Sequence, residues 1–174
     1  MTLDYSKVTF KDSIKVGSDD APLKIVEYIN LRCPDSKHYE EEIAPHLFEY
    51  IIDGKVQRIL KHFDKEKYPL EVGNLLNQYL DYEKQDATYR LMKVFFQNQD
   101  IWGKYRLTQI PHFASLNGFE LQENNLKQAQ RISKEVEEAN IELIPTIFVG
   151  QKAFVETIEF DEFDEFMKAL EEQL

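Results

Sequence analysis

The order of hydrophobic patterns along the chain constrains its fold more than any other feature. Leu23 to Ile29 is a short run rich in β-branched and aromatic residues, which is typical of a buried strand. From Ser36 the apolar residues follow helical spacing as far as Asp53-Gly54, with a kink expected at Pro45. Lys55 to Phe63 then has the pattern of a second strand. Strand, helix and strand in this order predict a βαβ unit.

The middle of the chain has a different character. From Tyr68 to Asn140 apolar residues recur at helical intervals, and Asn140 is expected to end the last helix in a left-handed conformation. That helix is expected to place one apolar stripe on the core, made of Leu126, Ala129, Ile132, Val136 and Ala139.

Strand patterns resume after this helical block. Ile144 to Val149 and Ala153 to Glu156 flank Gly150-Gln151, which suits a tight hairpin. A terminal helix is then expected to bury Phe163, Phe166, Met167, Leu170 and Leu174. The chain therefore divides into a βαβ half, a helical insertion and a ββα half. The fold class is α/β, with residues 1–65 and 141–174 around the sheet and 66–140 as the insertion.

Charge and length narrow the possible partners and location. The chain has 174 residues and a formal net charge of −11, so its surface repels phosphates, and we expect neither nucleic acid nor a membrane as a partner. No apolar stretch approaches the roughly 20 residues of a membrane span, and Met1 to Phe10 does not resemble a secretion signal. A single cysteine permits no internal disulfide, which favours a reducing compartment, and we expect the cytoplasm.

That cysteine stands at a chemically favourable place. Arg32-Cys33-Pro34-Asp35-Ser36 lies between the first strand and the helix, so Cys33 is expected at the first helical turn. Free amide groups and the helix dipole stabilise a thiolate there; Arg32 adds to this effect and Asp35 opposes it. A reactive role for this sulfur requires that it is exposed and ionised, and we expect an exposed thiol. The alternative is that Cys33 is a small buried apolar residue at a helix start.

Other candidate groups give weaker signals. His46, His62 and His112 lack the spacing of metal ligands, so we expect neither a metal site nor a cofactor. His38, five residues after Cys33, is expected to point elsewhere on its helix. Lys61 and His62 are expected to form a solvated strand end.

Several motifs resemble the DsbA-like branch of the thioredoxin superfamily over nearly the whole chain. In chain order they are Asp20-Ala21-Pro22-Leu23-Lys24-Ile25-Val26-Glu27-Tyr28, Cys33-Pro34-Asp35-Ser36, Phe95-Phe96 to Trp102, and Ile144-Pro145-Thr146-Ile147-Phe148-Val149-Gly150. They resemble, respectively, the opening strand of that family, its Cys-Pro-x-Cys motif, the end of a helix in its insertion, and its cis-proline segment.

The resemblance implies a thioredoxin-like fold with a central mixed sheet and a helical insertion. It implies that Pro145 is cis and faces Cys33, which leaves the Ile144 backbone free to pair with an extended substrate. Pro34 and Asp35 would join Ile144 in substrate binding. Glu27 would be a buried acid beneath the site that exchanges a proton with the sulfur; a solvent-facing strand residue is the alternative.

One position departs from the family motif, because Ser36 replaces its second cysteine. A serine hydroxyl does not resolve a mixed disulfide, so the resemblance implies monothiol exchange with a protein or low-molecular-weight disulfide, released by an external thiol. Two alternatives stay open. One is a redox-inactive module that binds a peptide or an adaptor protein, and the other is glutathione-transferase-like chemistry in which Ser36 or Cys33 activates a small thiol. The sequence does not predict the oligomeric state.

Overall fold

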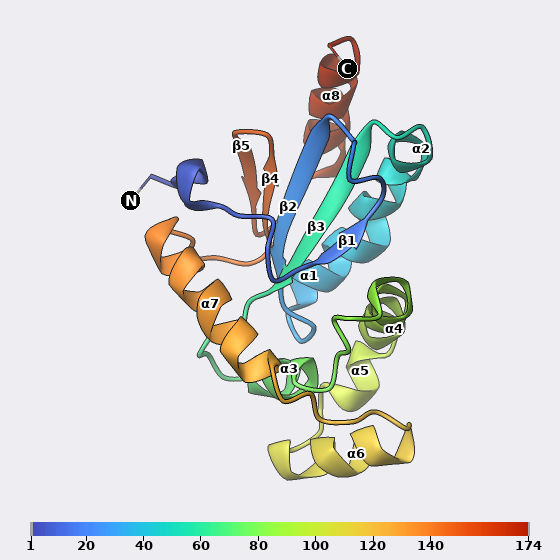
Figure 1. Ribbon diagram of the computed structural model, residues 1–174, viewed down its shortest axis with the longest axis vertical. Coiled ribbons are helices and arrows are strands. Elements are labelled where there is room, and N and C mark those ends of the chain that lie inside the picture. Colours follow the sequence, from blue (N-terminus) through green and yellow to red (C-terminus); the bar gives the residue numbers. More distant parts are fainter. Residues whose placement is uncertain (1, 174) are drawn as a thin grey trace.

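A computed structural model describes residues 2–173 and has a five-stranded sheet at its centre, in the order β1-β3-β2-β4-β5 (Figure 1). The two central strands β2 and β3 run parallel, and every other neighbouring pair is antiparallel. The strands are β1 (Ile14–Val16), β2 (Leu23–Ile29), β3 (Val56–His62), β4 (Thr146–Val149) and β5 (Lys152–Val155). The mixed sheet of an α/β fold is therefore confirmed.

The predicted strands are present with small shifts at their ends. β2 has the bounds that its apolar run predicts, and β3 is one residue shorter at each end. Gly150 joins β4 to β5 with a φ of +58°, a conformation that glycine adopts without a steric penalty. The sequence did not predict β1, because only three residues form it and the central one, Lys15, is exposed.

The segment between β2 and β3 is helical but changes its helix type three times. It consists of α1 (Pro34–His38), a π-helical turn η2 (Tyr39–Ile43), a 3-10 turn η3 (Ala44–Leu47) and α2 (Phe48–Ile52). The irregularity expected at Pro45 is present, since proline cannot donate an amide hydrogen bond inside a helix. It begins earlier than predicted, at Tyr39.

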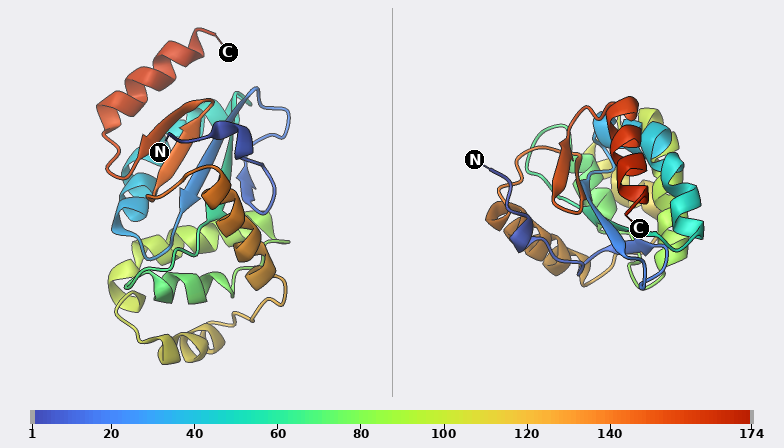
Figure 2. Two further views of the ribbon diagram at one scale, coloured as in Figure 1. Left: turned by 90° about the vertical axis from the view of Figure 1, so that its left-hand side faces the viewer. Right: turned by 90° about the horizontal axis from the view of Figure 1, so that it is seen from above.

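The central block is helical, as predicted. It contains α3 (Glu71–Asn77), α4 (Gln85–Gln97), α5 (Gln99–Trp102), η4 (Leu107–Gln109), α6 (Ile110–Leu116) and α7 (Asn125–Glu138). Helices α3, α5 and α6 lie beyond one end of the sheet, whereas the C-terminal α8 (Phe160–Glu171) lies toward the other end (Figures 1 and 2). Asn140 ends α7 with a φ of +56°, which confirms the left-handed cap.

One residue of the predicted stripe on α7 is misplaced. Leu126 is 60% exposed, because the first turn of α7 lies near α3 and not over the sheet (Figure 1). The later residues Ile132, Val136 and Ala139 are buried against β2, β3 and β4 as predicted. The domain boundaries 1–65, 66–140 and 141–174 stay a prediction, and within the described chain α7 packs directly on the sheet.

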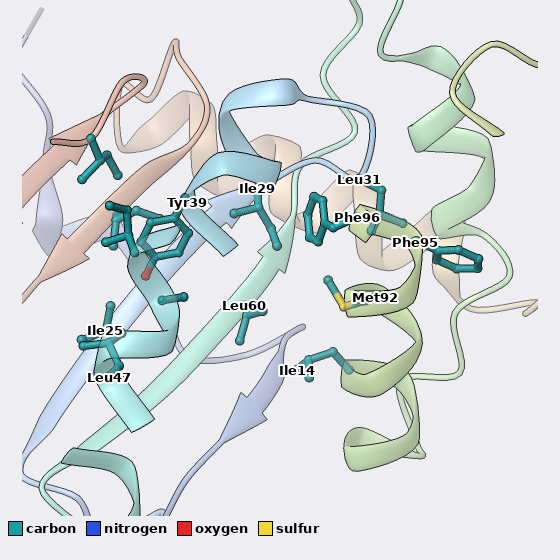
Figure 3. Packing of buried hydrophobic residues seen from close by; sticks show 14 of the residues in the cluster. Ile14, Ile25, Ile29, Leu31, Tyr39, Leu47, Leu60, Met92, Phe95 and Phe96 are labelled. Atoms are coloured by element: carbon teal, nitrogen blue, oxygen red, sulfur yellow. The ribbon is translucent and has the colours of Figure 1, made fainter. Parts of the chain in front are cut away.

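Two hydrophobic clusters cover the two faces of the sheet. The larger cluster joins β2 and β3 to the helical segment after β2, to α4 and to α8, and Figure 3 shows Tyr39, Leu60, Met92 and Phe96 in it. The smaller cluster lies under α7 and the N-terminal segment. Phe163 and Met167 of α8 are buried, Phe166 and Leu170 are half-buried, and Leu174 lies outside the described residues.

Candidate active site around Cys33

Cys33 caps α1 directly after the loop Asn30–Arg32, as predicted from the sequence. Its backbone is extended, with φ −73° and ψ 123°, and its carbonyl accepts the first helical hydrogen bond from the Lys37 amide at 3.1 Å. Pro34 follows at the first helical position, where the missing amide hydrogen costs nothing. Pro34 and Asp35 are exposed, so this turn of the helix faces solvent.

The sulfur atom lies against the loop that precedes β4. Cys33 Sγ donates a hydrogen bond of 3.5 Å to the Ile144 carbonyl, and the peptide bond between Ile144 and Pro145 is cis. The expectation of an exposed thiol is wrong, because Cys33 retains only 5% of its surface. Ile144 and Leu70 pack against it in the smaller hydrophobic cluster. A reacting disulfide therefore meets only a small exposed part of this residue.

Ser36 does not present its hydroxyl to solvent beside Cys33. It is completely buried, and its hydroxyl oxygen accepts a hydrogen bond of 3.3 Å from the Asn30 amide. The hydroxyl therefore links α1 to the end of β2. A buried oxygen in this position has no route to an incoming small thiol.

Glu27 is buried, but its partner is an arginine. Both carboxylate oxygens accept hydrogen bonds from Arg58, at 2.6 and 2.8 Å, and Arg58 also binds Glu40 at 2.5 Å and the Tyr89 hydroxyl at 2.7 Å. Burial raises the pKa of Glu27, and the Arg58 guanidinium opposes that rise. Among the described residues no hydrogen bond joins Glu27 to Cys33 or Ser36, so proton exchange with the sulfur stays a prediction. The solvent-facing alternative is excluded.

His62 fixes the loop before Cys33, a role that the sequence did not predict. It is completely buried, and its Nε2 atom accepts a hydrogen bond of 3.0 Å from the Leu31 amide. Its Nδ1 atom lies 2.7 Å from an Asp64 carboxylate oxygen, which assigns the ring proton to Nδ1. The expectation of a solvated strand end is therefore wrong, because α3 and the loop after β3 cover this end of the sheet.

Two amide side chains hold the rest of the loop. Asn30 donates to the Phe63 carbonyl at 2.9 Å and to Asn74 at 2.7 Å, and its own oxygen accepts from the Arg32 amide at 2.9 Å. Gln99 of α5 donates to the carbonyls of Leu31 at 2.7 Å and Cys33 at 3.1 Å. No local pattern marks these residues, although a polar residue directly after a buried strand is a weak signal for Asn30.

Lys61 is also buried, on the face of the sheet opposite to that of Glu27. Its Nζ atom donates to Glu135 of α7 at 2.5 Å and to the Thr9 hydroxyl at 3.1 Å. Burial lowers the pKa of Lys61, and Glu135 opposes this change. Because Glu27 and Lys61 belong to different faces, their two ion pairs are separate clusters.

Metal and membrane signals are absent from the described part of the chain. Between residues 2 and 173 no group of three or more His, Cys, Asp or Glu side chains is arranged to hold a metal ion. Over the same range no helix has both the length and the apolar composition needed to span a bilayer. His38 is exposed on the helix that follows Cys33.

Comparison of the whole chain with solved structures identifies proteins that share its fold. A conserved protein of unknown function from Enterococcus faecalis V583 is 32% identical with a TM-score of 0.89, over 95% of both chains. BdbD from Bacillus subtilis in its oxidised form is 19% identical with a TM-score of 0.70, over 92% of this chain and 94% of that one. The α-DsbA1 protein of Wolbachia pipientis is 20% identical with a TM-score of 0.75, over 94% and 92%. At identities of 19% and 20%, the last two matches establish a shared fold and no more.

Sequence comparison gives a consistent result. A probable disulfide bond formation protein D from Bacillus cereus is 29% identical over 85 residues, which are 48% of this chain and 39% of that protein. The match thus spans about two fifths of the curated relative. A family model described as thioredoxin matches residues 9–169, nearly the whole chain. The chain therefore belongs to the thioredoxin family, and its fold is that of the family's DsbA-like members.

Proposed function

We propose that this protein catalyses thiol–disulfide exchange with Cys33 as its single attacking sulfur. One observation carries the proposal: Cys33 Sγ lies at the start of α1 and 3.5 Å from the carbonyl of Ile144, the residue directly before Pro145. The name of the Bacillus cereus relative, a probable disulfide bond formation protein, supports the same chemistry.

The chemistry has two steps that need no second cysteine in the chain. The Cys33 thiolate attacks one sulfur of a substrate disulfide, forms a mixed disulfide and expels the other half as a thiolate. An external thiolate then attacks the mixed disulfide and restores Cys33. Ile144 precedes the first paired residue of β4, Thr146, so its backbone lies outside the sheet ladder. An extended substrate would pair there, with Pro34 and Asp35 on the other side of the sulfur.

The test measures exchange on a disulfide-linked peptide in the presence of an external thiol. We expect the protein to form a mixed disulfide, visible by mass spectrometry, and Cys33→Ser to abolish it. Ser36→Ala is the matched control and should retain exchange, because Ser36 is buried and bonded to the Asn30 amide. Iodoacetamide should label Cys33 in the native protein at a higher rate than that of global unfolding. Labelling no faster than unfolding would exclude the proposal.

A second function is favoured by the burial of the sulfur. A cysteine that is only 5% exposed is also consistent with a module that binds an extended peptide or an adaptor protein beside Pro145 without turnover. In that case Cys33→Ala would leave the affinity for the partner unchanged while no mixed disulfide forms in the wild type. The transferase alternative has less support, since the hydroxyl of Ser36 is fully buried. The cytoplasmic location stays a prediction.

A further inference from the structure

A hollow of about 730 Å³ opens beside the loop that carries Cys33. Arg32, the residue before Cys33, forms part of its wall together with the start of α3 and the segment between α5 and η4. The lining residues are Arg32, Tyr68, Pro69, Glu71, Val72, Gly103, Lys104, Tyr105, Arg106, Leu107 and Thr108. Pockets of roughly 300 to 1,000 Å³ hold small molecules in other proteins, so this hollow has the size of a ligand site.

The charge of the hollow is opposite to that of the molecule. The chain carries a formal net charge of −11, yet Arg32, Lys104 and Arg106 line the hollow with Glu71 as the one acidic side chain. In the part of the chain that the structure describes, none of these three cations forms an ion pair. Three cations without an acidic partner around one hollow form a site for an anion.

The Arg32 side chain is fixed by a hydrogen bond that leaves its charge available to a ligand. Its Nε atom donates a hydrogen bond of 2.9 Å to the Gly103 carbonyl. A Cβ atom at position 103 would lie 2.7 Å from this Nε and 2.4 Å from the Gln99 carbonyl oxygen, so the close approach requires glycine. Within residues 2–173 the terminal guanidinium nitrogens of Arg32 have no hydrogen-bond partner, and they are available to a carboxylate.

Two aromatic rings complete the hollow. Tyr68 is 83% exposed and Tyr105 is half-buried, so both present apolar surface to anything that enters. The hollow therefore offers cations for charged ends and rings for the body of a ligand. This combination suits a small peptide-like molecule with carboxylate groups.

We propose that the hollow binds the external thiol of the exchange reaction, and that this thiol is a small peptide-like molecule bearing carboxylates. The proposal rests on the proposed function, which needs an external thiol because Ser36 cannot resolve a mixed disulfide. The occupant is a free small molecule and not a segment of a protein, because the cations surround one hollow of ligand size.

The reaction balances with this thiol, written G–SH, as the only co-reactant. The Cys33 thiolate attacks the G sulfur of a disulfide G–S–S–R, forms Cys33–S–S–G, and releases R–S⁻, which takes a proton from solvent. A second G–S⁻ then attacks the G sulfur and yields G–S–S–G and the Cys33 thiolate. The net reaction converts G–S–S–R and one G–S⁻ into G–S–S–G and R–S⁻, so the sulfur of R is reduced to a thiolate while the sulfur of the second G–SH is oxidised to the disulfide level.

The first experiment compares two pairs of substitutions that change the charge equally. K104Q/R106Q removes two cations of the hollow, whereas R90Q/K127Q removes an exposed arginine and an exposed lysine elsewhere. The probes are glutathione disulfide, which carries carboxylates, and cystamine, a disulfide without them. The measurement is the rate at which each probe forms an adduct on Cys33 at low salt.

We expect K104Q/R106Q to slow the adduct from glutathione disulfide about ten-fold and to leave the cystamine rate unchanged or faster. R90Q/K127Q should change either rate by less than about two-fold, and added salt should reduce the ten-fold difference. Equal effects of the two pairs, or equal slowing of both probes, would overturn the proposal.

A second experiment separates the site from the proposed function. S-methylglutathione, which cannot react, is titrated into the Cys33→Ala protein, and binding that K104Q/R106Q weakens would support the site even if exchange fails. Exchange without such binding would retain the function and overturn the site. Tighter binding by an acidic peptide without a thiol would also overturn it, because the occupant would then be a protein segment.

Discussion

At the scale of single residues, position 36 lacks the second thiol that an internal disulfide with Cys33 would need. Ser36 lies one helical turn after Cys33 and is fully buried, with its oxygen turned to the Asn30 amide. The sulfur at position 33 therefore has no neighbour in the chain that can form a disulfide with it. The loop around it is nevertheless held by hydrogen bonds that its backbone amides donate to His62 and Asn30 and by one that Gln99 donates to it.

Restoring the second thiol tests whether position 36 is what prevents an internal disulfide with Cys33. We expect Ser36→Cys to give a protein that forms an internal disulfide with Cys33, because the two positions stand where the family motif has its two cysteines. Any mixed disulfide on Cys33 should then be resolved within the molecule, where the effective thiol concentration is about millimolar or higher. Thiol titration before and after mild oxidation, with wild type as control, measures it; two free thiols persisting in Ser36→Cys would contradict the expectation.

Arg58 is the residue that pairs with the buried carboxylates of Glu27 and Glu40. Arg58→Met keeps the volume but leaves Glu27 and Glu40 without their cation, and we expect it to lower the free energy of unfolding by about 3–5 kcal/mol. Replacing Glu27 by Gln in the same protein should recover part of that loss. Urea unfolding at pH 7 measures both, with Arg131→Met, an exposed arginine paired to Asp12, as the control.

The loss in Arg58→Met should depend on pH. Burial already raises the pKa of Glu27 above its ordinary value of 4.5, and removing Arg58 removes the influence that opposes this rise. A carboxyl group whose folded pKa is raised stabilises the fold below its unfolded pKa and loses that contribution as pH rises through the folded pKa. The variant should therefore approach wild type near pH 4.5 and fall furthest behind at neutral pH. A pH-independent difference would contradict this assignment.

At the scale of elements, apolar runs and helical spacing predicted β2, β3, the helical block and α8 well. Those patterns reflect burial of whole faces, which local sequence records. They do not record distant partners, and so β1, whose Ile14 pairs with Leu60, and the burial of Lys61 and His62 were missed. The cysteine and its proline were found through motifs, while His62 and Gln99 act through contacts made across the fold.

The loop between β2 and α1 gives the prediction at this scale. His62→Ala removes the acceptor of the buried Leu31 amide, and we expect it to cost about 1–3 kcal/mol of unfolding free energy. The Leu31 amide should also exchange its hydrogen faster, and His62→Gln should retain part of the protection because its side-chain oxygen can accept. His38→Ala, on the exposed side of α1, is the control and should change neither quantity. Unchanged exchange at Leu31 would show that His62 does not hold this loop.

At the scale of the whole molecule, the helices beyond the sheet are joined to it through packed side chains. Helix α4 of the central block contributes Met92 and Phe96 to the same cluster as β2 and β3, and α7 covers the opposite face. Trp102, the one tryptophan of the chain, is buried in α5, and its indole donates to the Phe95 carbonyl at 2.7 Å. Its fluorescence therefore reports on the surroundings of α5 in the helical block.

This arrangement predicts a single unfolding transition for the sheet and the helical block. If the shared cluster couples them, urea titrations followed by Trp102 fluorescence and by far-ultraviolet circular dichroism should give the same midpoint and the same slope. Met92→Ala, in the contact between α4 and the sheet, should lower both midpoints together and cost about 2–5 kcal/mol. Val94→Ala, on the exposed side of α4, is the control and should shift neither midpoint appreciably. An early transition seen only by fluorescence would mean that residues 66–140 unfold as a unit of their own, because the contacts of α4 and α7 with the sheet would then contribute less than the packing within the block.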